Sequence, residues 1–253
     1  MPVRPLAHLF PRLVADRAVR GVVVTTVLLA LTVPLLLRQS SAYGAGLSDG
    51  LSVGGGRGPA AVANLLALGM ALAAAWLSDG VVSELRRDGS GPLLLTRPVS
   101  CRGLFLARWL AGFAALAAVV LASVTTLNAI WRATEGSGSP LSVSGAIGAA
   151  IVTWTWVGSA VLLLSSVLER GEALAGGLLV ILPISLAAIL PPGSVPARLS
   201  GSLPSQDVLA ASRDLLAGHA VPGHALLSPL GWGCLTLAIG IFTACRREWR
   251  AAE

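Results

Sequence analysis

Residues 104–127 read LFLARWLAGFAALAAVVLASVTTL, and this run contains one charged residue, Arg108. Apolar side chains would fall on every side of a helix drawn through it, which is typical of a helix buried in protein or lipid. About 20 such residues span the hydrocarbon core of a bilayer. The run does not alternate between apolar and polar residues, and an open sheet cannot cross lipid. The sequence therefore predicts a transmembrane helix here.

Runs of the same kind recur along the chain. We predict transmembrane helices at 21–37, 59–77, 104–127, 146–168, 173–190 and 225–245. None of these runs contains an acidic residue, and we expect Pro34 and Pro229 to break the first and the last. The predicted fold is an all-α integral membrane protein, with one transmembrane domain over residues 1–253.

The composition excludes several classes of protein. Of the 253 residues, 55% are hydrophobic and 12% are charged, whereas about 25% of residues in a soluble domain are charged. These values exclude an ordinary soluble enzyme, a disordered tail and a disulfide scaffold. Cys101, Cys234 and Cys245 are scattered, so their spacing suggests neither a zinc site nor a disulfide framework.

All 18 basic residues are arginine, and their distribution predicts the orientation. Thirteen belong to the side that would hold both termini, the 79–103 loop and the 169–172 turn: Arg4, Arg12, Arg17, Arg20, Arg86, Arg87, Arg97, Arg102, Arg108, Arg170, Arg246, Arg247 and Arg250. The other side keeps five, namely Arg38, Arg57, Arg132, Arg198 and Arg213. Cytoplasmic loops are enriched in basic residues, so we predict that both termini are cytoplasmic. Arginines split between apolar runs fit this rule better than they fit nucleic-acid binding.

Tryptophans and polar residues mark the spans as well. Trp131 and Trp232 would lie near the outer interface, and Trp76, Trp109 and Trp249 near the inner one, as in an aromatic belt. Trp154 and Trp156 depart from this pattern. The polar residues of the fourth span would serve helix packing and back-bonding to carbonyls, or line a substrate path; they are Thr153, Thr155, Ser159, Ser165 and Ser166.

Two segments outside the spans have helical patterns. Residues 3–18 place Leu6, Phe10, Leu13 and Val14 at helical spacing, which predicts a helix lying on the inner surface of the bilayer or a solvated helix without a role. In the outer loop 191–224, the pattern predicts a short outer or re-entrant helix over 204–218. Its expected N-cap is Ser205, and Gly218 should end it.

The inner loop 79–103 is the most informative segment. A charged extension of the second span, with Glu84, Arg86 and Arg87, is followed by a Gly-Ser-Gly-Pro break at 89–92. The apolar triplet Leu93-Leu94-Leu95 comes next, and Arg97-Pro98 ends it. We then expect Ser100 to cap the third span. An apolar triplet rimmed by charge predicts either a docking surface for a cytoplasmic protein or burial in the inner leaflet.

These residues resemble the inner-loop motif of permease subunits of type-2 ABC transporters. In that family a Glu and a few charged residues precede Gly-Thr-Leu and then Leu-Leu-Ser-Arg-Pro-Val-Ser; here the run is Leu93-Leu94-Leu95-Thr96-Arg97-Pro98-Val99-Ser100. The resemblance extends over almost the whole chain: an interfacial helix, six spans, a short second inner loop and helices in the last outer loop. Arg86 or Arg87 occupies a usually acidic position, Ser90-Gly91-Pro92 replaces Gly-Thr-Leu, and Cys101 stands where a base is common.

The resemblance implies the membrane-spanning half of an exporter in a bacterial cytoplasmic membrane. Two permease chains, identical or different, would form a dimer, and each would dock one cytoplasmic ATPase subunit that binds ATP and Mg²⁺. The implied coupling residues are Glu84, Arg86, Arg87, Leu93, Leu94, Leu95, Arg97, Pro98, Glu169, Arg170 and Glu172. The chain has no lysine and so lacks the lysine of a phosphate-binding loop. We therefore expect no cofactor in this chain and no enzymatic activity of its own.

Other functions find less support in the sequence. His219 and His224 are separated by Pro222-Gly223, which breaks helical spacing, so we predict no metal site there. The spans contain neither a buried acid for a proton relay nor a Ser, His and Asp set for proteolysis. The alternative that remains is a membrane scaffold or assembly factor that recruits a cytoplasmic partner through the 79–103 loop without transport.

Overall fold

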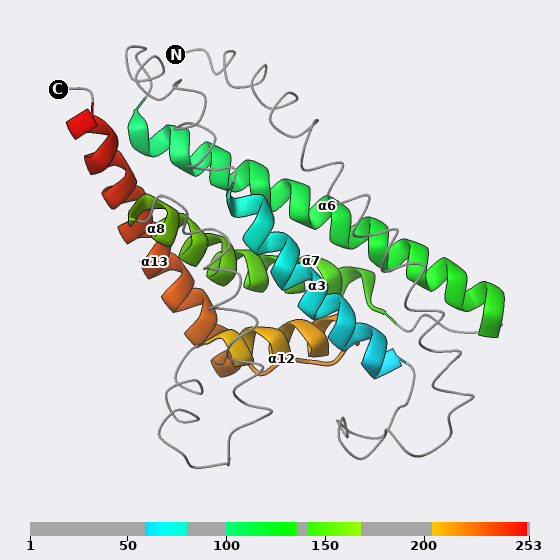
Figure 1. Cartoon of the computed structure of the whole chain (residues 1–253). Helices are drawn as coiled ribbons and strands as arrows, with labels where there is room; N and C mark the ends of the chain where they lie inside the picture. The colour runs from blue at the N-terminus through cyan, green and yellow to red at the C-terminus, as the bar shows by residue number, and fades with distance from the viewer. Residues whose placement is uncertain (1–58, 80–99, 136–140, 168–203, 252–253) are drawn as a thin grey trace, which may run out of the picture.

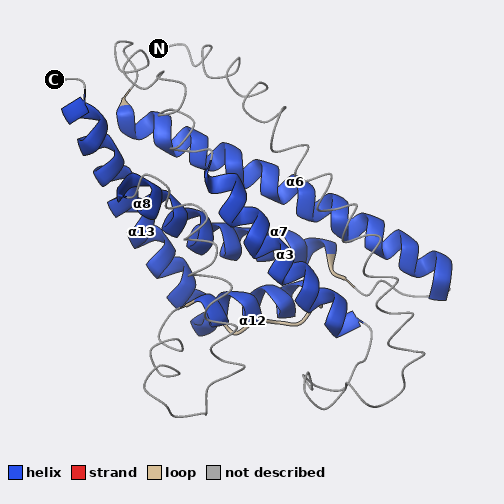
Figure 2. Cartoon of the chain, in the orientation of Figure 1, coloured by secondary structure: helices blue, strands red, loops and turns tan. Residues whose placement is uncertain are grey.

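The computed structural model describes residues 59–79, 100–135, 141–167 and 204–251. Of these residues, nearly all are helical, and none lies in a strand (Figures 1 and 2). The elements are α3 (Pro59–Asp79), α6 (Cys101–Glu135), α7 (Val143–Thr153), a π-helical turn η1 (Trp154–Gly158), α8 (Ser159–Val167), α12 (Ser205–Leu216) and α13 (Gly223–Ala251). The prediction of an all-α protein is confirmed for this part of the chain.

Three of the helices are long and apolar enough to cross a membrane. Their apolar parts are Cys101–Ala133, Val143–Val167 and Gly223–Arg246. The predicted second span, 59–77, corresponds to α3, whose apolar part Val62–Ser78 is shorter. The predicted spans 21–37 and 173–190, the 3–18 helix, the outer loop up to residue 203 and all but the ends of the 79–103 loop lie outside the described residues.

The helix ends differ from the predicted ends by up to eight residues. The run predicted at 104–127 belongs to a 35-residue helix, Cys101–Glu135, and the run at 146–168 is observed as 143–167. Ser100 caps α6 as predicted, because its hydroxyl accepts a hydrogen bond from the Gly103 N–H at 3.2 Å. The prediction that Pro229 breaks the last span is wrong, since α13 runs through it. Packing of α13 along η1 and α8 outweighs the local cost of the proline.

The short helix predicted in the last outer loop exists as α12. Gly218 follows its end with φ 77°, a conformation that glycine adopts without steric cost, as the sequence predicted. The N-cap is Pro204 rather than Ser205, so that part of the prediction is wrong. Its buried residues are Val208, Ala211, Ser212 and Leu216, and α12 packs chiefly against α7 and α3. The helix therefore leans on the bundle itself.

The ends of the helices gather at two opposite ends of the bundle. Figure 1 shows α3, α7–α8 and α13 running in one general direction and α6 running back. One end of the bundle holds Asp79, Cys101, Val167 and Ala251; we call it the arginine-rich end. Five described arginines lie toward it, Arg102, Arg108, Arg246, Arg247 and Arg250, while Arg132 and Arg213 lie toward the opposite end. The end that holds more of the described arginines is the one for which the whole sequence predicts an excess of arginine.

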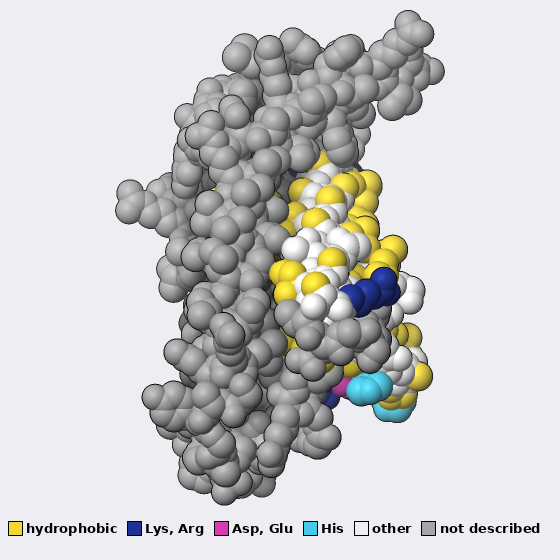
Figure 3. All heavy atoms as spheres, turned by 90° about the vertical axis from the view of Figure 1, so that its right-hand side faces the viewer, with side chains coloured by type: hydrophobic (Ala, Val, Ile, Leu, Met, Phe, Trp, Pro, Cys, Tyr) yellow, Lys and Arg dark blue, Asp and Glu magenta, His cyan; other side chains and the backbone are white. Residues whose placement is uncertain are grey.

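The continuous helix Val143–Val167 is the centre of the bundle. Of its most apolar 18 residues 72% are buried, against 22% of the corresponding residues in α6 and 17% in α13. The outward faces of α6 and α13 carry large apolar side chains, among them Leu106, Leu110, Leu235, Ile239 and Phe242. Figure 3 shows apolar side chains over much of the described surface on one face, with charged and histidine side chains near its lower edge. Apolar outward faces of this kind are typical of helices that face lipid.

Candidate functional site

The central helix is irregular at its middle. Residues Trp154–Gly158 form a π-helical turn between α7 and α8, and all five are buried. At the end of α7 the backbone N–H of Trp154 donates to the carbonyls of both Ala150 and Ile151. Single π-turns inside α-helices occur frequently at functional sites. Eleven helical residues precede this turn and nine follow it, so it lies near the midpoint of the span.

The Trp154 ring fills a slot that two glycines create. A Cβ placed on Gly112 of α6 would lie 2.5 Å from Cη2 of Trp154, and one on Gly158 would lie 2.9 Å from Cδ2. Trp154 is 0% exposed. Any larger residue at either position would have to displace a ring with no free space around it. The glycines thus fix how closely α6 approaches the central helix.

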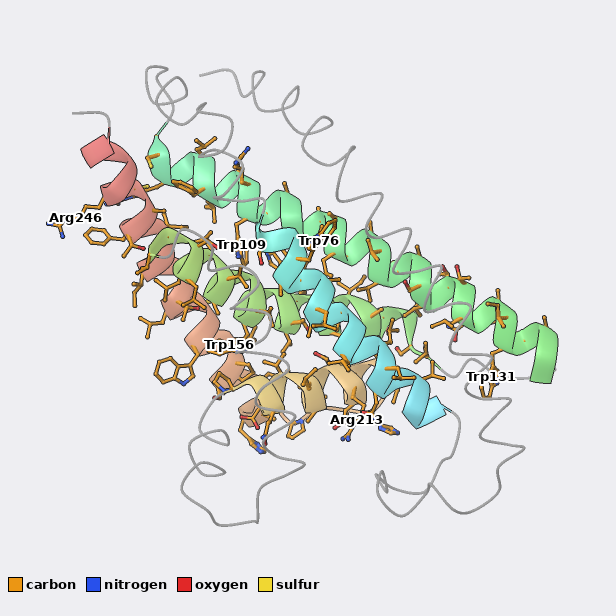
Figure 4. The ribbon with its side chains drawn as sticks, viewed as in Figure 1. Trp76, Trp109, Trp131, Trp156, Arg213 and Arg246 are labelled. Carbon is orange, nitrogen blue, oxygen red and sulfur yellow. The ribbon has the colours of Figure 1, made fainter. Side chains whose placement is uncertain are left out.

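Trp109 of α6 joins Trp154 in this slot. The two ring centroids are 6.0 Å apart and the ring planes are inclined by 50°, a favourable arrangement for an aromatic pair. Trp109 is buried, so its predicted place in the inner aromatic belt is wrong; the contact with Trp154 holds it inside the bundle. Figure 4 shows Trp109 between α6 and α8, whereas Trp131 and Arg246 lie toward the two ends of the bundle.

Three buried polar atoms in this region lack a hydrogen-bond partner among the described residues. They are Nε1 of Trp109, Nε1 of Trp154 and the hydroxyl of Ser159. Ser159 follows Gly158 directly and stands five residues after Trp154, the spacing that a π-turn brings together. We call these three residues the donor cluster. Each unpaired buried group lowers the free energy of unfolding by about 1–3 kcal/mol.

Ser159 differs from other hydroxyl residues in the helices. Ser78, Thr125 and Thr243 each bond back to the carbonyl four residues earlier, at 2.7 Å, 2.9 Å and 2.9 Å. The equivalent carbonyl for Ser159 belongs to Thr155, which contacts Gly233 of α13. The π-turn changes the local geometry, and the usual internal bond is not made. The hydroxyl of Ser159 is thereby left for another partner.

Two other polar residues of this span are paired across the bundle. Thr153 bonds to Ser212 of α12 with 2.9 Å between the hydroxyl oxygens. Ser166 bonds to Thr243 of α13 at 2.6 Å and to the Leu163 carbonyl at 2.6 Å. These contacts support the packing interpretation for Thr153 and Ser166. Thr155 is buried in the π-turn, and Ser165 is buried in α8.

The residues predicted to couple to an ATPase are not placed by the structure. Glu84, Arg86, Arg87, Leu93, Leu94, Leu95, Arg97, Pro98, Glu169, Arg170 and Glu172 all lie outside the described residues. His219 and His224 are exposed, and Asp214 pairs with Arg213 at 2.7 Å. The described residues contain no group of three or more side chains suited to hold a metal ion.

The sequence places Trp154 in the fourth predicted span but predicts no partner for its side chain. The available signal is the run Trp154-Thr155-Trp156-Val157-Gly158, in which large aromatic residues precede a glycine inside an apolar span. The pairing with Trp109 and Gly112 depends on the register between two helices, which no local pattern contains. The chain matches no family profile, no curated protein and no solved structure.

Proposed function

We propose that this chain is the membrane-spanning subunit of an ATP-driven exporter of the type-2 ABC class. The observation that supports the proposal best is the segment Glu84–Ser100, with its apolar triplet followed by Arg97-Pro98. This segment connects α3 to α6, and both helices meet it at the arginine-rich end. A segment so placed would face the cytoplasm if the positive-inside rule holds.

The helical architecture is compatible with this proposal. The structure is all-helical where described and has three helices able to cross a membrane, as expected of a multi-pass membrane protein. The contacts Thr155–Gly233 and Ser166–Thr243 show that α7–α8 and α13 run parallel. Parallel helices require a return crossing between Val167 and Gly223. The fifth predicted span, 173–190, falls in this interval and stays a prediction.

The proposed mechanism starts from the source of the energy that drives transport. A chain without lysine cannot supply the lysine of a phosphate-binding loop, so a partner ATPase would bind ATP and Mg²⁺. The triplet at 93–95 would seat in a groove of that ATPase, with Glu84, Arg97 and the 169–172 turn making polar contacts around it. Closure of two ATPase subunits would then rock the helices of two permease chains as rigid bodies.

Co-purification of the chain with ATP-binding subunits tests the docking step. Leu94→Asp places a charge in the apolar triplet and should abolish co-purification, while the matched control Leu94→Ile should retain it. Glu84→Ala should weaken the complex to a smaller degree. If Leu94→Asp binds as wild type does, the coupling segment has been wrongly assigned. A stable complex with a partner that hydrolyses no ATP would favour the scaffold alternative.

Cysteine labelling tests the orientation. In a variant with Cys101, Cys234 and Cys245 replaced by serine, Ser137→Cys should react with a membrane-impermeant thiol reagent added outside intact cells. A cysteine introduced at Ser90 should react only after the membrane is opened. The reverse pattern would overturn the topology and, with it, the cytoplasmic position of the docking segment.

A further inference from the structure

The two ends of the bundle differ in charge. Counted over the described residues, the arginine-rich end holds five arginines and two acidic residues, Asp79 and Glu248, which gives a net charge of +3. The opposite end holds two arginines and three acidic residues, Glu135, Asp207 and Asp214, which gives a net charge of −1. A surplus of positive charge on one side of a protein raises the local concentration of anions there. The arginine-rich end is therefore the part of the described bundle that attracts an anionic partner.

Two arginines at this end lie on the same helix faces as exposed apolar side chains. Arg246 of α13 follows Ile239 by seven residues and Phe242 by four, a spacing that places all three on one face, and all three are exposed. Arg102 of α6 precedes Leu106 by four residues, and both are exposed. Both helices are long and apolar enough to cross a membrane. The two arginines therefore lie where an apolar outward face meets the polar end of the bundle.

An aromatic ring holds the Arg246 side chain at this boundary. The Cζ atom of Arg246 lies 5.8 Å from the centroid of the Phe242 ring, within the range of a cation–π contact. Helical side chains lean toward the N-terminus of their helix, which brings the guanidinium of Arg246 back over Phe242. Figure 4 shows Arg246 projecting away from the bundle. The positive charge is thus presented sideways, at the margin of the apolar surface.

The charges of Arg102 and Arg246 are not neutralised by a carboxylate among the described residues. Arg213 at the opposite end provides the contrast, because its guanidinium bonds to the Asp214 carboxylate at 2.7 Å. A guanidinium can bind a phosphate through two parallel hydrogen bonds. Clusters of arginine at the end of a membrane-spanning helix attract anionic lipids. The partner that fits this end has a phosphate near the arginines and apolar chains along the helix faces beside them.

We infer that the arginine-rich end binds anionic phospholipids on the outward faces of α13 and α6. The headgroup phosphate accepts hydrogen bonds from Arg246 or from Arg102, and the acyl chains lie along Ile239 and Phe242 or along Leu106. A soluble anion would leave these apolar faces uncovered, and a neutral lipid would gain less from the net charge. The inference does not depend on the proposed transport function, because this binding requires neither ATP nor a partner ATPase.

Native mass spectrometry of the purified full chain in detergent micelles tests the inference, because it separates lipid-bound from lipid-free chains. Dioleoylphosphatidylglycerol should bind at least about fivefold more tightly than dioleoylphosphatidylcholine, which has the same acyl chains and no net charge. Glycerol 3-phosphate, an anion without acyl chains, should not displace the bound lipid. Equal affinities for the two lipids, or displacement by glycerol 3-phosphate, would overturn the inference.

Two double variants of equal charge locate the binding. In Arg102→Gln/Arg246→Gln the affinity for dioleoylphosphatidylglycerol should fall at least about fivefold, the effect of one basic residue near an anionic surface. The affinity for dioleoylphosphatidylcholine should not change. The matched control Arg132→Gln/Arg213→Gln removes the same charge from the opposite end and should bind both lipids as the wild type does. Equal losses in the two double variants would show that only total charge matters and would overturn the inference.

A third variant tests the part played by the aromatic ring. Phe242→Leu keeps the face apolar but removes the ring, and should lower the affinity for dioleoylphosphatidylglycerol by about twofold to fivefold. Trp232→Leu is the matched control, since Trp232 is also an exposed aromatic residue of α13 but lies 14 residues before Arg246. An unchanged affinity in Phe242→Leu would contradict the position assigned to the headgroup beside this ring.

Discussion

The central helix has two buried regions, its contact with α12 and the donor cluster, which differ in whether their polar groups are hydrogen-bonded. Where α7 meets α12, Thr153 bonds to Ser212 and the Ser142 N–H bonds to the Leu216 carbonyl at 2.7 Å. A few residues further on, the donor cluster leaves three polar atoms unpaired among the described residues. Both regions are buried, so burial alone does not explain the difference.

The α7–α12 region is held by hydrogen bonds, whereas the polar atoms of the donor cluster have no partner among the described residues. The α7–α12 contact is closed by glycine as well: a Cβ on Gly145 would overlap the Leu215 carbonyl, and Gly148 lies against the Leu215 side chain. Asn128 closes the neighbouring turn, since its side chain bonds to both the N–H and the carbonyl of Leu141 at 3.2 Å and 2.9 Å. Hydrogen bonds and close packing therefore fix the α7–α12 contact, whereas each unpaired group of the donor cluster costs stability.

The largest effect should come from a methyl group in the closed contact. In Gly145→Ala the added Cβ would meet backbone atoms of Leu215, which cannot move without shifting α12. We expect a loss of about 2–3 kcal/mol in the free energy of unfolding, typical of overpacking. Unfolding of the purified protein in mixed detergent micelles measures it. Gly231→Ala, where nothing lies within 4 Å, should leave stability unchanged or raise it by up to about 1 kcal/mol. Equal losses in both would break the comparison.

Removal of the hydrogen bond between α7 and α12 should have the next largest effect. Ser212→Ala leaves the buried Thr153 hydroxyl without its partner, and we expect a loss of about 1–2 kcal/mol. A double-mutant cycle with Thr153→Val should give a coupling energy of about 0.6 kcal/mol, the average between membrane helices, and at most about 1.7 kcal/mol. A coupling energy near zero would show that this bond does not hold α12 in place.

The same substitution in the donor cluster should have the smallest effect and the opposite sign. Ser159→Ala removes a buried hydroxyl that has no partner among the described residues. The free energy of unfolding should stay the same or rise by up to about 1 kcal/mol, because no hydrogen bond is lost and the desolvation cost of the buried hydroxyl is removed. A loss as large as that of Ser212→Ala would mean that Ser159 is paired in the resting protein.

Much of the described fold could be predicted from apolar runs and helix-capping residues. The α6 helix, the α7–α8 helix, α13 and the short α12 were expected, as were the cap at Ser100 and the helix end at Gly218. These features depend on residues close together in the sequence. Pro229 was misjudged because its effect depends on packing against α8 and η1, which a local rule does not include.

The candidate site could not be predicted for the same physical reason. The sequence predicts that Trp109 lies at the membrane interface. In the structure Gly112 and Gly158 leave room for the Trp154 ring, so α6 packs closely on the central helix and Trp109 contacts Trp154. The π-turn at 154–158 and the unpaired Ser159 hydroxyl directly after it have no local sequence pattern that predicts them. The predicted coupling residues present the opposite case, because the sequence predicts them in detail and they lie outside the described residues.

The rate of ATP hydrolysis by the proposed complex of this chain with an ATP-binding subunit tests the central claim most directly. With the complex in nanodiscs, Leu94→Asp should lower the rate to that of the ATP-binding subunit alone, and Leu94→Ile should keep the wild-type rate. Any chain in which residues 93–95 transmit motion must show this difference. A Leu94→Asp complex that stays assembled and hydrolyses ATP at the wild-type rate would contradict the account.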